Sequence, residues 1–224
     1  MPAVAQVFRT GLELGPGLTI LVGENGSGKS TMVEIMAEAY GLNPQGGSIL
    51  APEPMPGVRQ TEPHVGQRLL VERGAGWRSA WAYFLRADTM HSLYSYLEES
   101  RVSGARRLHK LSHGQGFLEI LRTRVNQRGF YLMDEPDAPL SFVSCLGLVA
   151  LLHDLATAGS QVVVATHSPI VASVPGARIL ELGEWGLRPA DWENLEIVQS
   201  WRTFLGNPDR FLRYLLSDSD DEEE

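Results

Sequence analysis

Cysteine, long apolar runs and excess positive charge are all scarce in this sequence of 224 residues. The one cysteine, Cys145, excludes a disulfide framework within the chain and favours a reducing, cytoplasmic setting. No apolar run approaches the roughly 18–20 residues that cross a bilayer. Residues 1–15 also lack the basic-then-apolar pattern of a secretory signal. We therefore expect a cytoplasmic protein without a transmembrane segment.

The negative charge is concentrated at the end of the chain. The formal net charge is −8, but the last eight residues, SDSDDEEE, contain six acidic residues and no basic one. Residues 1–216 therefore carry a net charge of only −2. We interpret 217–224 as a disordered acidic tail and 1–216 as one domain. This balance does not indicate nucleic-acid binding, although the basic residues at 101–110 leave a local patch open.

Segments typical of strands alternate with segments typical of helices, which predicts an α/β fold. The run 130–136 is almost continuously apolar, as in a strand buried on both faces of a parallel sheet. Further strands are predicted at 3–9, 18–23, 68–72, 80–88 and 161–167, with a hairpin at 177–192. Helices are predicted at 29–40, 89–100, 112–127 and 141–158, after Pro169, and twice between the hairpin and residue 216. We expect a mostly parallel sheet with an antiparallel edge.

The stretch GENGSGKST, residues 23–31, matches the pattern G-x-x-x-x-G-K-[ST] between a predicted strand and a predicted helix. Glycines let the backbone point its N–H groups at phosphate oxygens, and the helix N-terminus attracts anions. Lys29 is expected to reach the β- and γ-phosphates of ATP, and Ser30 to ligate Mg²⁺. The full phosphate site is expected to comprise Gly23, Glu24, Asn25, Gly26, Ser27, Gly28, Lys29, Ser30 and Thr31. The alternative is a glycine turn that only caps a helix.

Acidic and imidazole side chains follow two other predicted strands. Asp134 ends the strand within FYLMDEP, where it is expected to hold Mg²⁺. Glu135 comes next and is the candidate general base that activates the attacking water. His167 follows VVVAT and is the candidate sensor of the γ-phosphate. An acidic turn cap and a structural histidine are the alternatives.

Together these motifs resemble the ATP-binding-cassette (ABC) ATPase family. The resemblance rests on the phosphate loop at 23–31, LSHGQ at 111–115, LMDEP at 132–136 and ATHSP at 165–169. These motifs stand in the family's order, and FLRAD, YLMDEP and ATHSPIV are similar to small bacterial ATPases of ABC or AAA type. The resemblance implies a P-loop NTPase fold with a small helical subdomain at about 89–128. It also implies that ATP and Mg²⁺ are bound and that ATP is hydrolysed.

The LSHGQ segment resembles the family's signature, which serves the ATP of a second subunit. The resemblance implies that Ser112, His113, Gly114 and Gln115 close on the γ-phosphate bound by the partner's phosphate loop. Ser112 suits a helix N-cap, Gly114 lets the backbone approach, and a helix N-terminus attracts anions. We therefore expect a nucleotide-dependent homodimer. A simple helix cap is the alternative for Ser112.

Three features depart from the family pattern. His113 stands where the signature usually has a glycine. Ser141 stands where an aspartate would bridge the dimer, which leaves Ser141 a helix-capping role. No clear glutamine marks the family's Q-loop, so Asp88 is a further metal or water candidate and Gln67 is a weaker one.

Four functions fit these observations. The first is an ATPase that dimerises around two ATP–Mg²⁺ and drives a conformational change in an unidentified protein partner. The second is the ATP-binding subunit of a membrane transporter, which the altered Q-loop and the small helical subdomain rank lower. The third is a DNA-repair or defence ATPase that works with a nuclease, although no coiled-coil insertion separates the motifs. The fourth, a non-enzymatic nucleotide-gated module, leaves Glu135 without a role.

Overall fold

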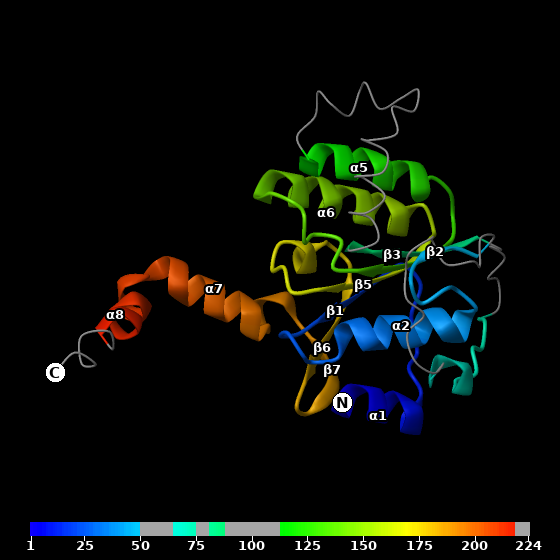
Figure 1. The fold of residues 1–224 in the computed structure, drawn as a ribbon, viewed down its shortest axis with the longest axis horizontal. Helices are drawn as coiled ribbons and strands as arrows, with labels where there is room; N and C mark the ends of the chain where they lie inside the picture. The colour runs from blue at the N-terminus through cyan, green and yellow to red at the C-terminus, as the bar shows by residue number, and fades with distance from the viewer. Residues whose placement is uncertain (50–64, 75–80, 88–112, 218–224) are drawn as a thin grey trace.

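A seven-stranded sheet runs through the computed structural model, which describes residues 1–49, 65–74, 81–87 and 113–217 (Figure 1). The strands are β1 (Leu18–Val22), β2 (Gly47–Ser48), β3 (Ala82–Arg86), β4 (Phe130–Asp134), β5 (Gln161–Thr166), β6 (Arg178–Gly183) and β7 (Gly186–Ala190). Their order is β2-β3-β4-β5-β1-β6-β7. The five inner strands are parallel, whereas β2 and β7 are antiparallel to their neighbours. The predicted sheet is confirmed, with an antiparallel strand at both edges.

Helices lie on both faces of this sheet (Figure 1). The α-helices among the described residues are α1 (Pro2–Thr10), α2 (Lys29–Tyr40), α5 (His113–Arg124), α6 (Phe142–Thr157), α7 (Glu196–Gly206) and α8 (Asp209–Ser217). The 3-10 helices in the described part of the chain are η1 (Val65–Arg68), η2 (Val171–Ser173) and η3 (Trp192–Asn194). Within the described ranges, no helix has the length and apolar character that crossing a membrane requires.

Strand side chains alternate between two apolar cores, as the two-residue period of a strand requires. Tyr131 and Met133 of β4 enter the core that α5 and α6 cover. Phe130 and Leu132 of the same strand enter the core that α1 and α2 cover. Helices α2 and α5 therefore lie on opposite faces of the sheet, which matters for the site described below.

The segment predicted as a strand at 3–9 is a helix, α1. Ala3 and Val7, four residues apart, are both buried and face the core under α2. Gln6 fixes the helix against the edge strand, because its amide donates to the Leu187 carbonyl and accepts from the Leu187 N–H. The pattern AVAQVF fits strand alternation as well as this helical spacing, so the choice depended on tertiary packing.

The strand predicted at 68–72 is also absent. Residues 65–68 form η1, and residues 69–74 have no regular structure. β3 already pairs with β2 on one side and β4 on the other, so its edges offer no place for a further strand. The helix predicted at 89–100, most of the helical subdomain at 89–128 and the tail at 218–224 lie outside the described residues.

A matched pair of leucines in α6 tests the core. Leu148 is fully buried, whereas Leu146, two residues earlier, is half exposed. Leu148→Ala should lower the free energy of unfolding by about 2–5 kcal/mol, because it leaves a cavity. Leu146→Ala should change it by less than about 0.5 kcal/mol. Urea denaturation without nucleotide measures both, and equal losses would contradict this packing.

Candidate functional site

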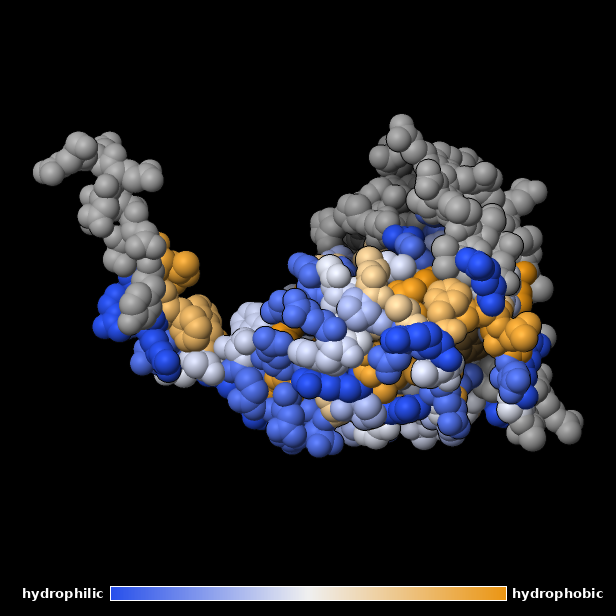
Figure 2. All heavy atoms as spheres, turned by 90° about the horizontal axis from the view of Figure 1, so that it is seen from below, coloured by the Kyte–Doolittle hydropathy of each residue, from blue (hydrophilic) through white to orange (hydrophobic). Residues whose placement is uncertain are grey.

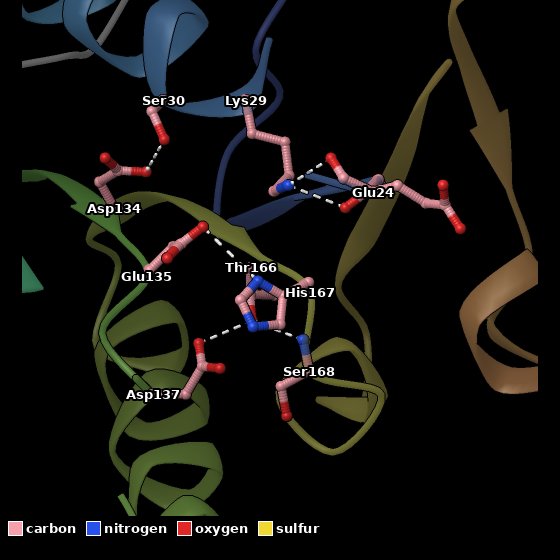
Figure 3. Close-up of polar contacts among 10 residues, drawn as sticks. Glu24, Lys29, Ser30, Asp134, Glu135, Asp137, Thr166, His167 and Ser168 are labelled. Atoms are coloured by element: carbon pink, nitrogen blue, oxygen red, sulfur yellow. Dashed lines mark hydrogen bonds and ion pairs between the residues drawn. The ribbon is translucent and has the colours of Figure 1, made fainter. Parts of the chain in front are cut away.

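The predicted phosphate, acidic and histidine residues converge at the carboxyl edge of the parallel strands (Figure 3). β1 leads into the phosphate loop, β4 ends at Asp134, and β5 is followed by His167. β4, β5 and β1 are neighbours in the sheet. Parallel strands end at the same edge, so motifs about 100 residues apart meet there.

The phosphate loop has the backbone that its glycines predict. Gly26 and Gly28 have φ angles of +82° and +98°, a region that side-chain-bearing residues rarely adopt. Gly23 has no room for a side chain, because a Cβ there would lie 2.6 Å from the Leu182 carbonyl oxygen. The Ser27 hydroxyl is buried without a hydrogen-bond partner among the described residues. An orphaned hydroxyl in a glycine loop fits a bound phosphate oxygen.

Lys29 lies at the first residue of α2 and is only 4% exposed. Its ammonium donates to the Gly23 carbonyl at 2.8 Å and to the Glu24 carbonyl at 2.9 Å. The Glu24 carboxylate itself points away (Figure 3). Burial lowers the pKa of Lys29, against the opposing effect of the carboxylates of Glu135 and Asp134. The loop therefore holds a buried cation where a phosphate would supply the missing negative charge.

Ser30 and Asp134 form the predicted metal pair. The Ser30 hydroxyl donates to Asp134 Oδ1 at 3.0 Å. Burial raises the pKa of Asp134, and the hydrogen bond from Ser30 works in the opposite direction. In the described residues, no group of three His, Cys, Asp or Glu side chains could enclose a metal alone. A hydroxyl with one carboxylate suits Mg²⁺, which takes its remaining ligands from phosphate and water.

Arg86 is a neighbour of this pair that sequence reasoning missed. It stands opposite Asp134 in the β3–β4 register, and its charge opposes the upward shift of the Asp134 pKa. Its guanidinium pairs with Glu34 Oε1 at 2.5 Å. The segment FLRAD drew attention to Asp88, which lies outside the described residues, rather than to this arginine. The side chain of the weaker candidate Gln67 also lies outside them.

Glu135 and His167 face one another across the ends of β4 and β5 (Figure 3). Glu135 Oε1 lies 3.5 Å from His167 Nδ1, a nitrogen that makes no hydrogen bond with the described residues. Glu135 has φ of +49° and is the one described non-glycine residue with positive φ. Its N–H donates to the Ala165 carbonyl at 2.9 Å, which holds the turn against β5. A residue whose strained backbone is held in place by its neighbours, with its carboxylate beside an imidazole, is typical of a reactive centre.

A second pair, Asp137 and Thr166, reinforces this arrangement and was not predicted. The Thr166 hydroxyl donates to Asp137 Oδ1 at 2.6 Å, and both side chains are buried. The same hydroxyl oxygen accepts from the Ser168 N–H at 2.9 Å. Burial raises the pKa of Asp137. Because Asp137 follows Glu135 by two residues and Thr166 precedes His167, this bond fixes the two functional side chains relative to each other.

The signature residues are only partly described. Ser112 lies outside the described residues, and of His113 only the backbone, the first residue of α5, is described. Gly114 is buried, and a Cβ there would lie 2.8 Å from Ser144 Oγ in α6. Gln115 is exposed. Gly114 therefore also allows close packing of α5 on α6, a role that the sequence did not reveal.

Ser141 caps α6, as the sequence predicts. It is the N-cap of α6, and its hydroxyl accepts from the Ser144 N–H at 3.4 Å. In the phosphate loop, Glu24 and Asn25 are exposed at the rim, and Thr31 is half-buried behind Ser30. The nine predicted residues thus form the loop after β1 and the start of α2, with Lys29 and Ser30 directed inward.

Comparison with known proteins identifies the family. A family model described as ABC transporter matches residues 11–138, which contain the phosphate loop, the signature and Asp134–Glu135. The chain belongs to the ABC transporter family. As an ABC ATPase it hydrolyses ATP, and its sheet, with the phosphate loop after β1, is a P-loop NTPase fold.

Two named proteins and one solved structure are similar to this chain. Macrolide export ATP-binding/permease protein MacB of Escherichia coli is 24% identical over 84% of this chain, which spans 33% of MacB. Cytochrome c biogenesis ATP-binding export protein CcmA of Rhodopseudomonas palustris is 31% identical over 71% of this chain and 82% of CcmA. The SMC head domain from Thermotoga maritima has a TM-score of 0.48 and 14% identity, covering 80% of this chain and 92% of that domain.

Removing the buried ammonium tests the phosphate loop. Lys29→Ala should weaken ATP binding at least about tenfold, because a charge-assisted contact to the phosphates is lost. Arg9→Ala removes a cation from the exposed face of α1 and serves as the control. Isothermal calorimetry measures both affinities. Unchanged ATP affinity in Lys29→Ala would contradict the site.

Asp134→Asn should separate stability from function. The raised pKa of Asp134 means that its ionised form destabilises the fold. The gain in free energy of unfolding from Asp134→Asn should be small below pH ~4, where Asp134 is protonated in both states. It should grow as the pH rises above ~4 and through the folded-state pKa, because Asp134 then ionises. Asp154→Asn, an exposed carboxylate, is the control. Thermal denaturation at pH 4 and 7 should show this gain, while ATP–Mg²⁺ no longer stabilises the variant.

Proposed function

We propose that two copies of this chain close around two ATP–Mg²⁺, and that hydrolysis drives a conformational change in a protein partner. The main observation that supports this proposal is that α2 and α5 lie on opposite faces of the sheet. The phosphate loop opens α2, and the signature opens α5. Because the signature lies across the sheet from the phosphate loop of its own chain, it is better placed to meet the phosphate loop of a second copy.

The chemistry follows from the residues at the edge. Bound at Ser30 and Asp134, Mg²⁺ would neutralise charge on the β- and γ-phosphates. Glu135 takes a proton from the attacking water as the water oxygen bonds to the γ-phosphorus. The bond from that phosphorus to the bridging oxygen breaks, and ADP leaves. His167, within 3.5 Å of Glu135, orients the water and the γ-phosphate.

A membrane permease is the first class of partner to examine. The relatives MacB and CcmA are named as export proteins, and CcmA is matched over 82% of its length. Their names support a transporter subunit as a second candidate function for this chain. Co-purification with a membrane protein from native cells would favour it over a soluble partner.

Blocking the base should trap the dimer. Glu135→Gln should bind ATP–Mg²⁺, lose on the order of 10²–10⁴ in hydrolysis rate and accumulate as a closed dimer. Light scattering with and without ATP–Mg²⁺ measures the mass. A monomer at tens of micromolar protein with saturating nucleotide would contradict the proposal.

Ser112→Arg is the complementary variant. It leaves the phosphate loop intact, so it should bind ATP but neither dimerise nor hydrolyse it. Mixed with Lys29→Ala chains, it should regain one composite site per heterodimer, in which intact Lys29 faces intact Ser112. Normal hydrolysis by Ser112→Arg alone would show that the signature only caps α5.

A further inference from the structure

The end of the described chain forms an apolar arm with no counterpart in the site. We define the C-terminal arm as residues 199–217, from the second turn of α7 through α8. Its root is buried, because Leu195 and Val198 lie in the core. Beyond Val198 the arm is exposed to solvent, and Figure 2 shows apolar atoms along its surface, apart from the body. Its large exposed apolar residues include Trp201, Phe204, Leu205, Phe211, Leu212 and Leu215.

Contacts within the arm bury only part of these apolar side chains. Phe204 and Phe211 pack edge to face with ring centroids 5.8 Å apart, which ties α8 to α7. Leu205 and Leu215 nevertheless remain 69% and 74% exposed. Helices of 11 and 9 residues are marginal in water without tertiary packing. An amphipathic pair of this kind marks an interaction surface.

The root of the arm is fixed at the same edge of the sheet as the nucleotide site. Trp192 Nε1 donates to the Pro169 carbonyl at 2.8 Å, and Pro169 follows His167 by two residues. The Glu196 N–H donates to Glu181 Oε1 at 3.2 Å, near the carboxyl end of β6. From this root the arm leaves the body on the side where β1 ends and α2 begins (Figure 1).

We propose that the C-terminal arm packs its apolar face on a second copy of this chain. The inference rests on the proposed function, which brings a second copy to the phosphate-loop edge. An arm that projects from that edge must meet the copy that closes on it, so its surface continues the proposed dimer interface. The docked arm removes apolar surface from water, and this burial favours the closed state.

The body offers matching apolar surface at the same edge. Phe142 and Val143, in the first turn of α6, are 66% and 74% exposed. They follow the loop that carries Glu135, so they lie at the carboxyl end of the sheet. Each copy thus presents both an apolar arm and an apolar patch to its partner, as a two-fold interface requires.

Hydrogen–deuterium exchange tests the burial of the arm directly. In Glu135→Gln with ATP–Mg²⁺, amides of residues 199–217 should exchange at least about tenfold more slowly than without nucleotide. Ser112→Arg with ATP–Mg²⁺ should show no slowing there, because it binds nucleotide without dimerising. Slowing in both variants would mean that the arm folds back on its own subunit, and would overturn the proposal.

A matched substitution tests the energetics. In the Glu135→Gln background, Leu212→Gln with Leu215→Gln keeps good helix formers and removes two apolar side chains from each arm. The ATP-dependent dimer dissociation constant should rise at least about 100-fold, while ATP affinity of the monomer stays unchanged. Arg210→Gln, on the same helix, is the control and should change the constant less than about threefold.

The outcomes separate this inference from the proposed function. If Glu135→Gln dimerises with ATP–Mg²⁺ but the arm exchanges freely and the leucine variant dimerises normally, the dimer stands and the arm proposal falls. If no chain dimerises under any condition, the proposed function fails and a second copy is not the occupant. If the arm is instead protected by vesicles or by a co-purified protein in the monomer, the proposal is likewise overturned.

Discussion

Buried charge at the carboxyl edge of the sheet is the constraint on which the rest of the site depends. Lys29 and Asp134 are held largely out of water, which lowers the pKa of the first and raises that of the second. Both shifts mean that the fold holds these two charged groups at a cost. At the proposed site, a triphosphate would bring negative charge to Lys29, and Mg²⁺ would bring positive charge to Asp134. Binding of both ligands there would relieve both costs at one place.

The sheet also places different parts of the site on its two faces. Its two faces carry separate cores, so α2 and the phosphate loop belong to one face and α5 to the other. What joins them is the edge itself, where Glu135 and His167 complete the site between the faces (Figure 3). This geometry supports the proposed composite site between two copies, because the phosphate loop and α5 lie on separate faces of each copy.

Contiguous motifs were predictable from the sequence, whereas contacts between distant segments were not. The loop at 23–31 and the pair Asp134–Glu135 each lie within one short segment, so the sequence alone predicted their local structure. The Asp137–Thr166 bond joins two segments whose separation in sequence hides it, and both residue types are common in turns. The prediction of a strand at 3–9, where α1 forms, was wrong for a related reason: AVAQVF fits both the strand period and the helix period, and packing decided between them. The two terminal helices were expected, but nothing in their sequence showed that they leave the body.

The hydrogen bonds at the end of β5 relate the site to the rest of the molecule. Thr166 is tied to Asp137 and Ser168 on one side of His167, and the Pro169 carbonyl is tied to Trp192 on the other. Trp192 begins η3, which leads directly into α7. If His167 senses the γ-phosphate as proposed, its displacement would act both on the segment that positions Glu135 and on the root of the arm. One short loop thus connects the proposed γ-phosphate sensor with the exposed apolar arm.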